Sequence, residues 1–141
     1  LNIDQESLGG ILIPMQEYDL PSKALRKTLN QIGVKDKRRA REVLSFFVDL
    51  FESLKNLVPI VKWGGHICIV IGNRRVKQVT IPTDIIITEL SQAIGLSHVR
   101  TFIRAISNKR MPRLNSPTNV EGMTETTMNE EYILVLRKDS L

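Results

Sequence analysis

GGHICIVIGNRR, residues 64–75, is the stretch that decides the fold. Its apolar run, Ile67–Ile71, lies between a glycine pair and a cationic cluster. A run this short is typical of a strand that is apolar on both faces, so we expect a buried strand in the middle of an α/β sheet. Ligands of open α/β sheets bind at the loops beyond the carboxyl ends of the strands. The candidate binding residues that follow this strand are Asn73, Arg74, Arg75 and Lys77.

Size and composition are those of one soluble domain, with 141 residues, 42% of them hydrophobic and 25% charged. The longest apolar runs have four to five residues, far short of the roughly 20 that cross a bilayer, so we expect no membrane association. The first residues carry no secretory signal and Cys68 is the single cysteine, which favours a reducing, cytoplasmic compartment. The sequence does not begin with methionine, which leaves open whether it is trimmed or a piece of a longer protein.

The net charge of +5 and the isoelectric point near 9.6 favour an anionic partner. Nucleic acid is the first candidate, and a basic face that only meets solvent is the alternative.

Three helices are predicted, over residues 22–31, 36–58 and 82–94. Ser22 and Asp36 are suitable N-caps, Gly33 and Pro59 are suitable stops, and apolar residues recur at helical spacing between them. Residues 37–41 place a cationic cluster at the start of the long helix, where positive charge opposes the helix dipole. We divide the chain into residues 1–35, an irregular segment with a short helix, and residues 36–141, an α/β domain.

Two further strands are predicted, over residues 99–106 and 132–136. A strand, a helix and a strand at this spacing predict a parallel pair, whereas the closing strand follows a loop without a helix and can run antiparallel. The loop over residues 107–129 has no apolar period.

A second cationic cluster follows the strand at residues 99–106. If the two strands are parallel neighbours, both cationic loops leave the sheet at one edge. The candidate residues of this second loop are Asn108, Lys109, Arg110, Met111, Pro112 and Arg113.

Other kinds of site are not favoured by the sequence. His66 and His98 have no metal-ligand partners at suitable spacing, and no nucleophile motif, Walker loop or Gly-x-Gly-x-x-Gly is present. Cys68 lies in the apolar strand, where we expect a buried, inert thiol.

Five segments in order resemble the latter half of site-specific DNA amino-methyltransferases of restriction-modification systems. They are KWGGH at 62–66, NRRVK at 73–77, IPTD at 81–84, NKRMP at 108–112 and EEYILVLRK at 130–138. The resemblance covers roughly residues 38–138. It implies methyl transfer from S-adenosylmethionine to adenine N6 or cytosine N4 in double-stranded DNA.

The resemblance also implies a fold and roles for the two loops. The family has a Rossmann-like sheet of seven strands whose last strand is antiparallel and inserted between the fifth and sixth. The three predicted strands would be the last three, a partial sheet with flanking helices. Arg74, Arg75 and Lys77 would contact phosphates, and the loop from Asn108 to Pro112 would pack around a base flipped out of the duplex.

Two family motifs are absent from the sequence. It has no Pro-Pro-aromatic catalytic signature and no glycine-rich loop for the methyl donor, so we assign no catalytic residue. We expect the C-terminal part of a methyltransferase, which requires a missing N-terminal part or self-association. The alternatives are a non-catalytic nucleic-acid-binding module with this half-fold, and a small α/β interaction protein that is basic by chance.

Overall fold

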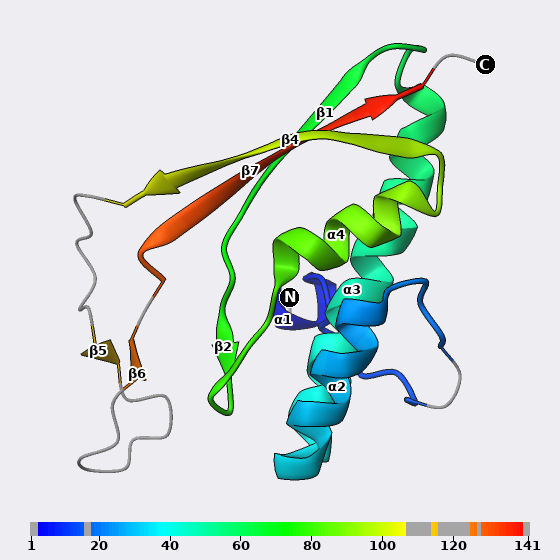
Figure 1. Cartoon of the computed structure of the whole chain (residues 1–141). Coiled ribbons are helices and arrows are strands. Elements are labelled where there is room, and N and C mark those ends of the chain that lie inside the picture. The colour runs from blue at the N-terminus through cyan, green and yellow to red at the C-terminus, as the bar shows by residue number, and fades with distance from the viewer. Residues whose placement is uncertain (1–2, 16–17, 107–113, 116–124, 127, 140–141) are drawn as a thin grey trace.

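The computed structural model describes residues 3–15, 18–106, 114–115, 125–126 and 128–139. The helices are α1 (Ile3–Glu6), α2 (Lys23–Lys35), α3 (Lys37–Leu57), the 3-10 helix η1 (Val58–Ile60) and α4 (Thr83–Gln92). The strands are β1 (His66–Ile71), β2 (Arg75–Val76), β3 (Val79–Thr80), β4 (Leu96–Ala105), β5 (Leu114–Asn115), β6 (Glu125–Thr126) and β7 (Glu130–Lys138) (Figure 1). None of the described helices is long and apolar enough to span a membrane.

Both predicted N-caps are confirmed. The Ser22 hydroxyl accepts a hydrogen bond from the Leu25 N–H, and the Asp36 carboxylate accepts one from the Arg39 N–H, each at 3.0 Å. The expected stop at Gly33 is wrong, because α2 continues to Lys35. A glycine inside a helix costs about 1 kcal/mol relative to alanine, and a Cβ at position 33 would make only an ordinary contact with Ala40 of α3. The helix tolerates this cost and ends at Lys35, directly before the Asp36 cap of α3.

The main sheet has the order β1-β7-β4, and both pairings are antiparallel. The expected antiparallel closing strand is therefore confirmed, and it lies between the other two. The expectation that β1 and β4 are parallel neighbours is wrong. They run in the same direction, but β7 separates them.

The helices cover one face of this sheet. Leu25 of α2, Phe47 of α3, Ile86 of α4 and Leu134 of β7 belong to a single buried cluster, against which Ile69 of β1 packs. A smaller cluster at the other end of the sheet consists of Ile67, Leu96 and Leu136. The hydrophobic core thus lies between α3 and α4 and the inner face of the sheet, and α2 extends it by packing on α3, α4 and β3 (Figure 1).

The expectation of a strand buried on both faces is wrong for β1. It is an edge strand, and on its outer face Cys68 is exposed and Val70 has 57% of its surface exposed. The predicted burial of the Cys68 thiol is therefore also wrong. The physical reason is that no described segment packs on this face of the sheet or pairs with the free edge of β1.

Candidate nucleic-acid interface

Residues 73–81, expected as a loop, contain a short hairpin made of β2 and β3. Arg75 pairs with Thr80 and Val76 with Val79, so that Lys77 and Gln78 form a two-residue turn. Both turn residues have positive φ, at 50° and 65°. Turns of this kind match the twist of the flanking strands but favour Asn and Gly. Here a lysine and a glutamine adopt this backbone conformation, which costs energy.

The hairpin is attached to the junction of α2 and α3. The Lys77 ammonium lies 3.1 Å from the Asp36 carboxylate, and the Lys35 ammonium donates a hydrogen bond to the Lys77 carbonyl at 3.0 Å. The pKa of Asp36 is lowered, first by the hydrogen bond from the Arg39 N–H and next by Lys77. These contacts place the cations of the hairpin beside those at the start of α3.

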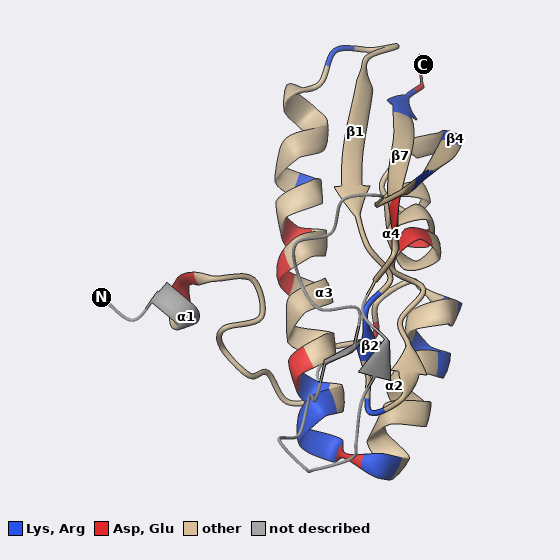
Figure 2. Ribbon diagram, turned by 90° about the vertical axis from the view of Figure 1, so that its left-hand side faces the viewer, with Lys and Arg blue, Asp and Glu red and all other residues tan. Residues whose placement is uncertain are grey.

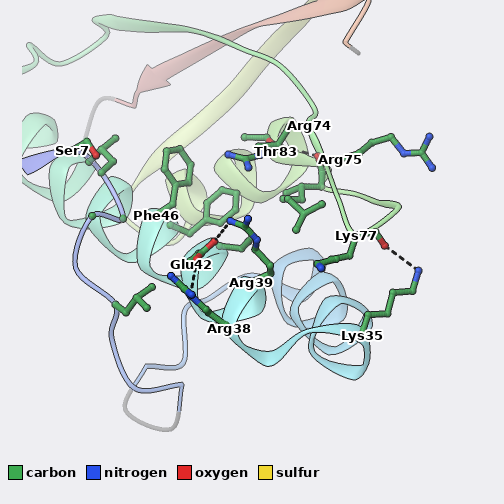
Figure 3. Close-up of a pocket in the computed structure, with 18 of the residues that line it drawn as sticks. Ser7, Lys35, Arg38, Arg39, Glu42, Phe46, Arg74, Arg75, Lys77 and Thr83 are labelled. Atoms are coloured by element: carbon green, nitrogen blue, oxygen red, sulfur yellow. Dashed lines mark hydrogen bonds and ion pairs between the residues drawn. The ribbon is translucent and has the colours of Figure 1, made fainter. Parts of the chain in front are cut away.

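The result is a hollow of about 1230 Å³, which we call the basic groove. Phe46, Phe47, Val43 and Ile81 contribute apolar surface to it. Figure 2 shows Lys and Arg residues gathered around the junction of α2 and α3 and beside β2, and Figure 3 shows the groove itself. Its cationic lining residues are Lys35, Arg38, Arg39, Arg74, Arg75 and Lys77.

The N-terminal segment forms another wall of the groove and is attached to α3. The Gly9 N–H donates to the Asp49 carboxylate at 2.7 Å, and the Ile13 N–H donates to the Ser45 hydroxyl at 3.1 Å. Gly9 has a φ of 77°, and a Cβ at this position would come within 2.9 Å of the backbone of Phe46. Only glycine therefore fits this close crossing of the segment over α3.

Glu42 is the one carboxylate among the described residues that line the groove. Glu42 pairs with Arg38 at 3.3 Å and with Arg39 at 2.5 Å (Figure 3). In contrast, the Arg74 side chain forms no hydrogen bond or ion pair with any residue that the structure describes, and the Arg75 guanidinium makes only a long contact, 3.4 Å, to the Gln78 carbonyl. Guanidinium groups with free N–H donors can bind phosphate oxygens.

Asn73 lies next to the groove residues in sequence but has another partner. Its amide donates to the Asp84 carboxylate at 2.8 Å and accepts from the Asp84 N–H at 3.3 Å, which links the end of β1 to the start of α4. Tyr132 lies beside this pair, and burial, followed by the nearby carboxylates of Glu130 and Asp84, raises its pKa. A DNA contact by Asn73 stays a prediction.

The structure thus brings together three of the predicted site residues, Arg74, Arg75 and Lys77. Asn73 lies beside them, and the remaining six, from Asn108 to Arg113, lie outside the described residues, so their contacts with DNA stay predictions. Sequence reasoning missed Lys35 and Glu42. Glu42 follows Arg38 by four positions and Arg39 by three, which is the spacing of ion pairs on a helix surface. Nothing in the sequence indicates that these pairs face the hairpin.

No metal site is found in the described part of the chain, because it contains no group of three or more His, Cys, Asp or Glu side chains suitably placed.

Comparisons with known proteins give a relative and a similar structure, and no family model matches. The Type II methyltransferase M.MvaI of Kocuria varians is 43% identical over 141 aligned residues, which cover 96% of this chain and 31% of that protein. The chain therefore spans about a third of the length of that relative. The resemblance to part of a restriction-modification DNA methyltransferase is confirmed.

The similar structure supports the fold. A candidate DNA modification methylase from Thermus thermophilus superposes with a TM-score of 0.51 over 85% of this chain and 52% of that protein. The two sequences are 16% identical, so this likeness concerns the arrangement of helices and strands alone.

Proposed function

We propose that this chain is part of an S-adenosylmethionine-dependent, site-specific DNA methyltransferase that modifies adenine N6 or cytosine N4, and that its basic groove holds DNA phosphates. The observation that carries the proposal is the 43% identity to a Type II methyltransferase along nearly the whole chain. The groove adds a physical role, because six cations converge there from α2, α3 and the hairpin.

The strand order supports the same proposal. The resemblance implies that the last strand of the family's sheet is antiparallel and inserted between the fifth and sixth, and β7 lies in this way between β1 and β4. On this proposal the three strands are the end of a Rossmann-like sheet, and α3 and α4 are the helices that precede its fifth and sixth strands.

Catalysis then depends on protein outside this chain. Neither the Pro-Pro-aromatic signature nor the glycine-rich donor loop is in the sequence, so we propose that S-adenosylmethionine binds chiefly to the missing part. The uncovered sheet face is a suitable surface for that part or for a second copy of the chain. It carries the apolar side chains of Cys68, Val70, Phe102, Ile133 and Val135, which neighbour one another in the register.

The role proposed for the groove is to position the DNA backbone. Arginine and lysine bind phosphate groups and release the counterions condensed on DNA, so the logarithm of the affinity falls with the logarithm of the salt concentration, by about 0.9 per phosphate contacted. Such contacts do not read sequence. They help to hold the duplex while a base is extruded, which costs a few kcal/mol.

A salt titration tests this role. Binding of a fluorescently labelled DNA duplex is measured by anisotropy at several salt concentrations for the wild type and for the Arg74→Ala, Arg75→Ala double variant. If each arginine contacts one phosphate, the slope decreases in magnitude by about 2. The control is Lys23→Ala with Lys27→Ala, which removes the same charge from exposed positions of α2 outside the groove. Equal slopes in the two double variants would contradict the proposal.

The absence of both catalytic motifs favours a second candidate function, a nucleic-acid-binding module without catalysis. Calorimetric titration with S-adenosylmethionine, with and without duplex DNA, separates the two. Binding of the donor by this chain favours the methyltransferase role, whereas salt-sensitive DNA binding without donor binding favours the module or a missing donor-binding part. The titration is then repeated with the N-terminal part of the aligned relative added. Donor binding in the mixture favours the missing donor-binding part, and its continued absence favours the non-catalytic module.

A further inference from the structure

We infer that Arg38 and Arg39 form a phosphate-binding subsite inside the basic groove, and that Glu42 is a built-in counterion that phosphate displaces. The inference rests on the proposed function, since it concerns the same groove. Its ligand class is the phosphate group of a nucleic-acid strand.

The geometry shows one carboxylate holding two guanidiniums. Its Oε1 lies 3.3 Å from Arg38 Nε, and its Oε2 lies 2.5 Å from Arg39 Nη1. A phosphate group with two free oxygens can make the same pair of contacts. Each guanidinium has five N–H donors, and these two contacts use one nitrogen of each, so both keep donors for an incoming anion.

The ion pairs are accessible to solvent. The Arg38 and Arg39 side chains have 79% and 52% of their surface exposed, and the Glu42 side chain has 28%. Exposed ion pairs on a helix are weak, whereas charge-assisted bonds to phosphate are among the strong ones. Exchange of the glutamate for a phosphate is therefore favourable when phosphate groups are held near the groove by other cations.

The other cations of the groove can hold phosphate groups near Arg38 and Arg39. Lys77 pairs with Asp36, but Lys35, Arg74 and Arg75 have no carboxylate partner among the described residues. Glu42 thus neutralises only part of a dense positive field. Such a field attracts anions to the groove, and a polyanion can neutralise it more fully than one carboxylate can.

The inference predicts that removing the Glu42 charge strengthens phosphate binding. Glu42→Gln leaves Arg38 and Arg39 free before the ligand arrives and removes repulsion between the carboxylate and the phosphate. We expect the affinity to rise by about three- to tenfold, from the usual strength of exposed pairs together with the lost repulsion.

Glu52→Gln is the matched control. Glu52 lies on the same helix and pairs with Lys55 at the same i,i+3 spacing and the same 2.5 Å distance, yet neither residue lines the groove. The two variants have the same net charge, so a general electrostatic effect would change both affinities alike.

The experiment uses two probes. Sodium tripolyphosphate, titrated by calorimetry, tests the subsite without DNA, and a labelled duplex tests the subsite in its proposed context. The expected result is a three- to tenfold gain for Glu42→Gln and less than a twofold change for Glu52→Gln with both probes. In a background of Arg38→Gln with Arg39→Gln, the Glu42→Gln change should give no gain, because its two partners are gone.

The outcomes separate this inference from the proposed function. An unchanged tripolyphosphate affinity in folded Glu42→Gln, or an equal gain in Glu52→Gln, overturns the subsite whatever DNA does. A gain for tripolyphosphate without measurable binding of duplex DNA supports the subsite and contradicts the DNA role. If Glu42→Gln fails to fold, tripolyphosphate binding by Arg38→Gln with Arg39→Gln decides instead, and wild-type affinity there overturns the inference.

Discussion

Lys138, at the end of β7, is expected to stabilise the fold through its charge. The residue is 9% exposed, and its ammonium donates hydrogen bonds to the Val58 and Val61 carbonyls at 2.9 and 3.0 Å. It also lies 4.5 Å from the centroid of the Trp63 ring. The side chain therefore joins the last strand to the carboxyl end of the α3 and η1 region. Lys138→Met keeps most of the apolar stem and removes these three interactions.

The magnitude follows from the contacts. A hydrogen bond to a charged group contributes about 1.5–3 kcal/mol, and a cation–π contact about 0.5–2 kcal/mol. The Val58 carbonyl keeps a partner in the variant, since it also accepts from the Val61 N–H at 3.3 Å, and methionine still packs against Trp63. We therefore expect Lys138→Met to lower the free energy of unfolding by about 2–4 kcal/mol, a large part of the usual 5–15 kcal/mol.

The assay is urea unfolding followed by circular dichroism and by the fluorescence of Trp63, the single tryptophan of the chain. Lys62→Met is the control, because it makes the same substitution at an exposed lysine beside Trp63. A loss below about 0.5 kcal/mol for Lys138→Met, or a loss equal to that of the control, would refute the reasoning that the ammonium contacts stabilise the fold.

Three further predictions concern the turn, the helix junction and the uncovered face. Gln78→Gly should raise the free energy of unfolding in urea by about 0.5–1 kcal/mol, because glycine accepts the positive φ of the turn, while the salt slope of DNA binding stays unchanged. The lowered pKa of Asp36 means that its ionisation stabilises the fold above the unfolded pKa, near the model-compound value of 3.8, and that this contribution is lost as the pH falls through the folded value. The stability difference between wild type and Asp36→Asn, from urea midpoints, should therefore shrink on going from about pH 7 to about pH 3; a constant difference would contradict it. Maleimide should label the exposed Cys68 of this chain readily in native conditions. If the proposed N-terminal methyltransferase part covers the sheet, adding it should slow the labelling; equal rates would argue against covering of this face.

Local signals in the sequence were sufficient for most elements. The caps at Ser22 and Asp36 and the proline at position 59 define the helices because capping and proline geometry depend on a few neighbouring residues. The apolar runs define β1 and β7 for the same reason. Gly33 shows the limit of local reasoning, since a glycine can stand inside a helix as well as end one, and α2 continues past it to Lys35.

The basic groove could not be predicted in the same way. Its assembly depends on contacts between residues about forty positions apart, such as the hydrogen bond from Lys35 to the Lys77 carbonyl. The turn at Lys77 and Gln78 lacks the Asn-Gly signature of a two-residue hairpin, so the sequence favoured a loop. The sequence does indicate the cationic clusters at residues 37–41 and 73–77, but not that they meet in one groove.

The two edges of the sheet differ in a way that explains why β1 was wrongly predicted to be buried on both faces. The β4 edge carries Arg100 and Arg104 and an irregularity between His98 and Arg100, and charges and bulges of this kind protect natural edges from pairing. The strand β1 has no Lys, Arg, Asp, Glu or Pro along Ile67–Ile71. An unprotected edge that is apolar on both faces is typical of an interior strand. The sequence of β1 thus favours a further strand beside it and a cover on its outer face, which is the arrangement expected if the chain is, as proposed, one part of a larger methyltransferase.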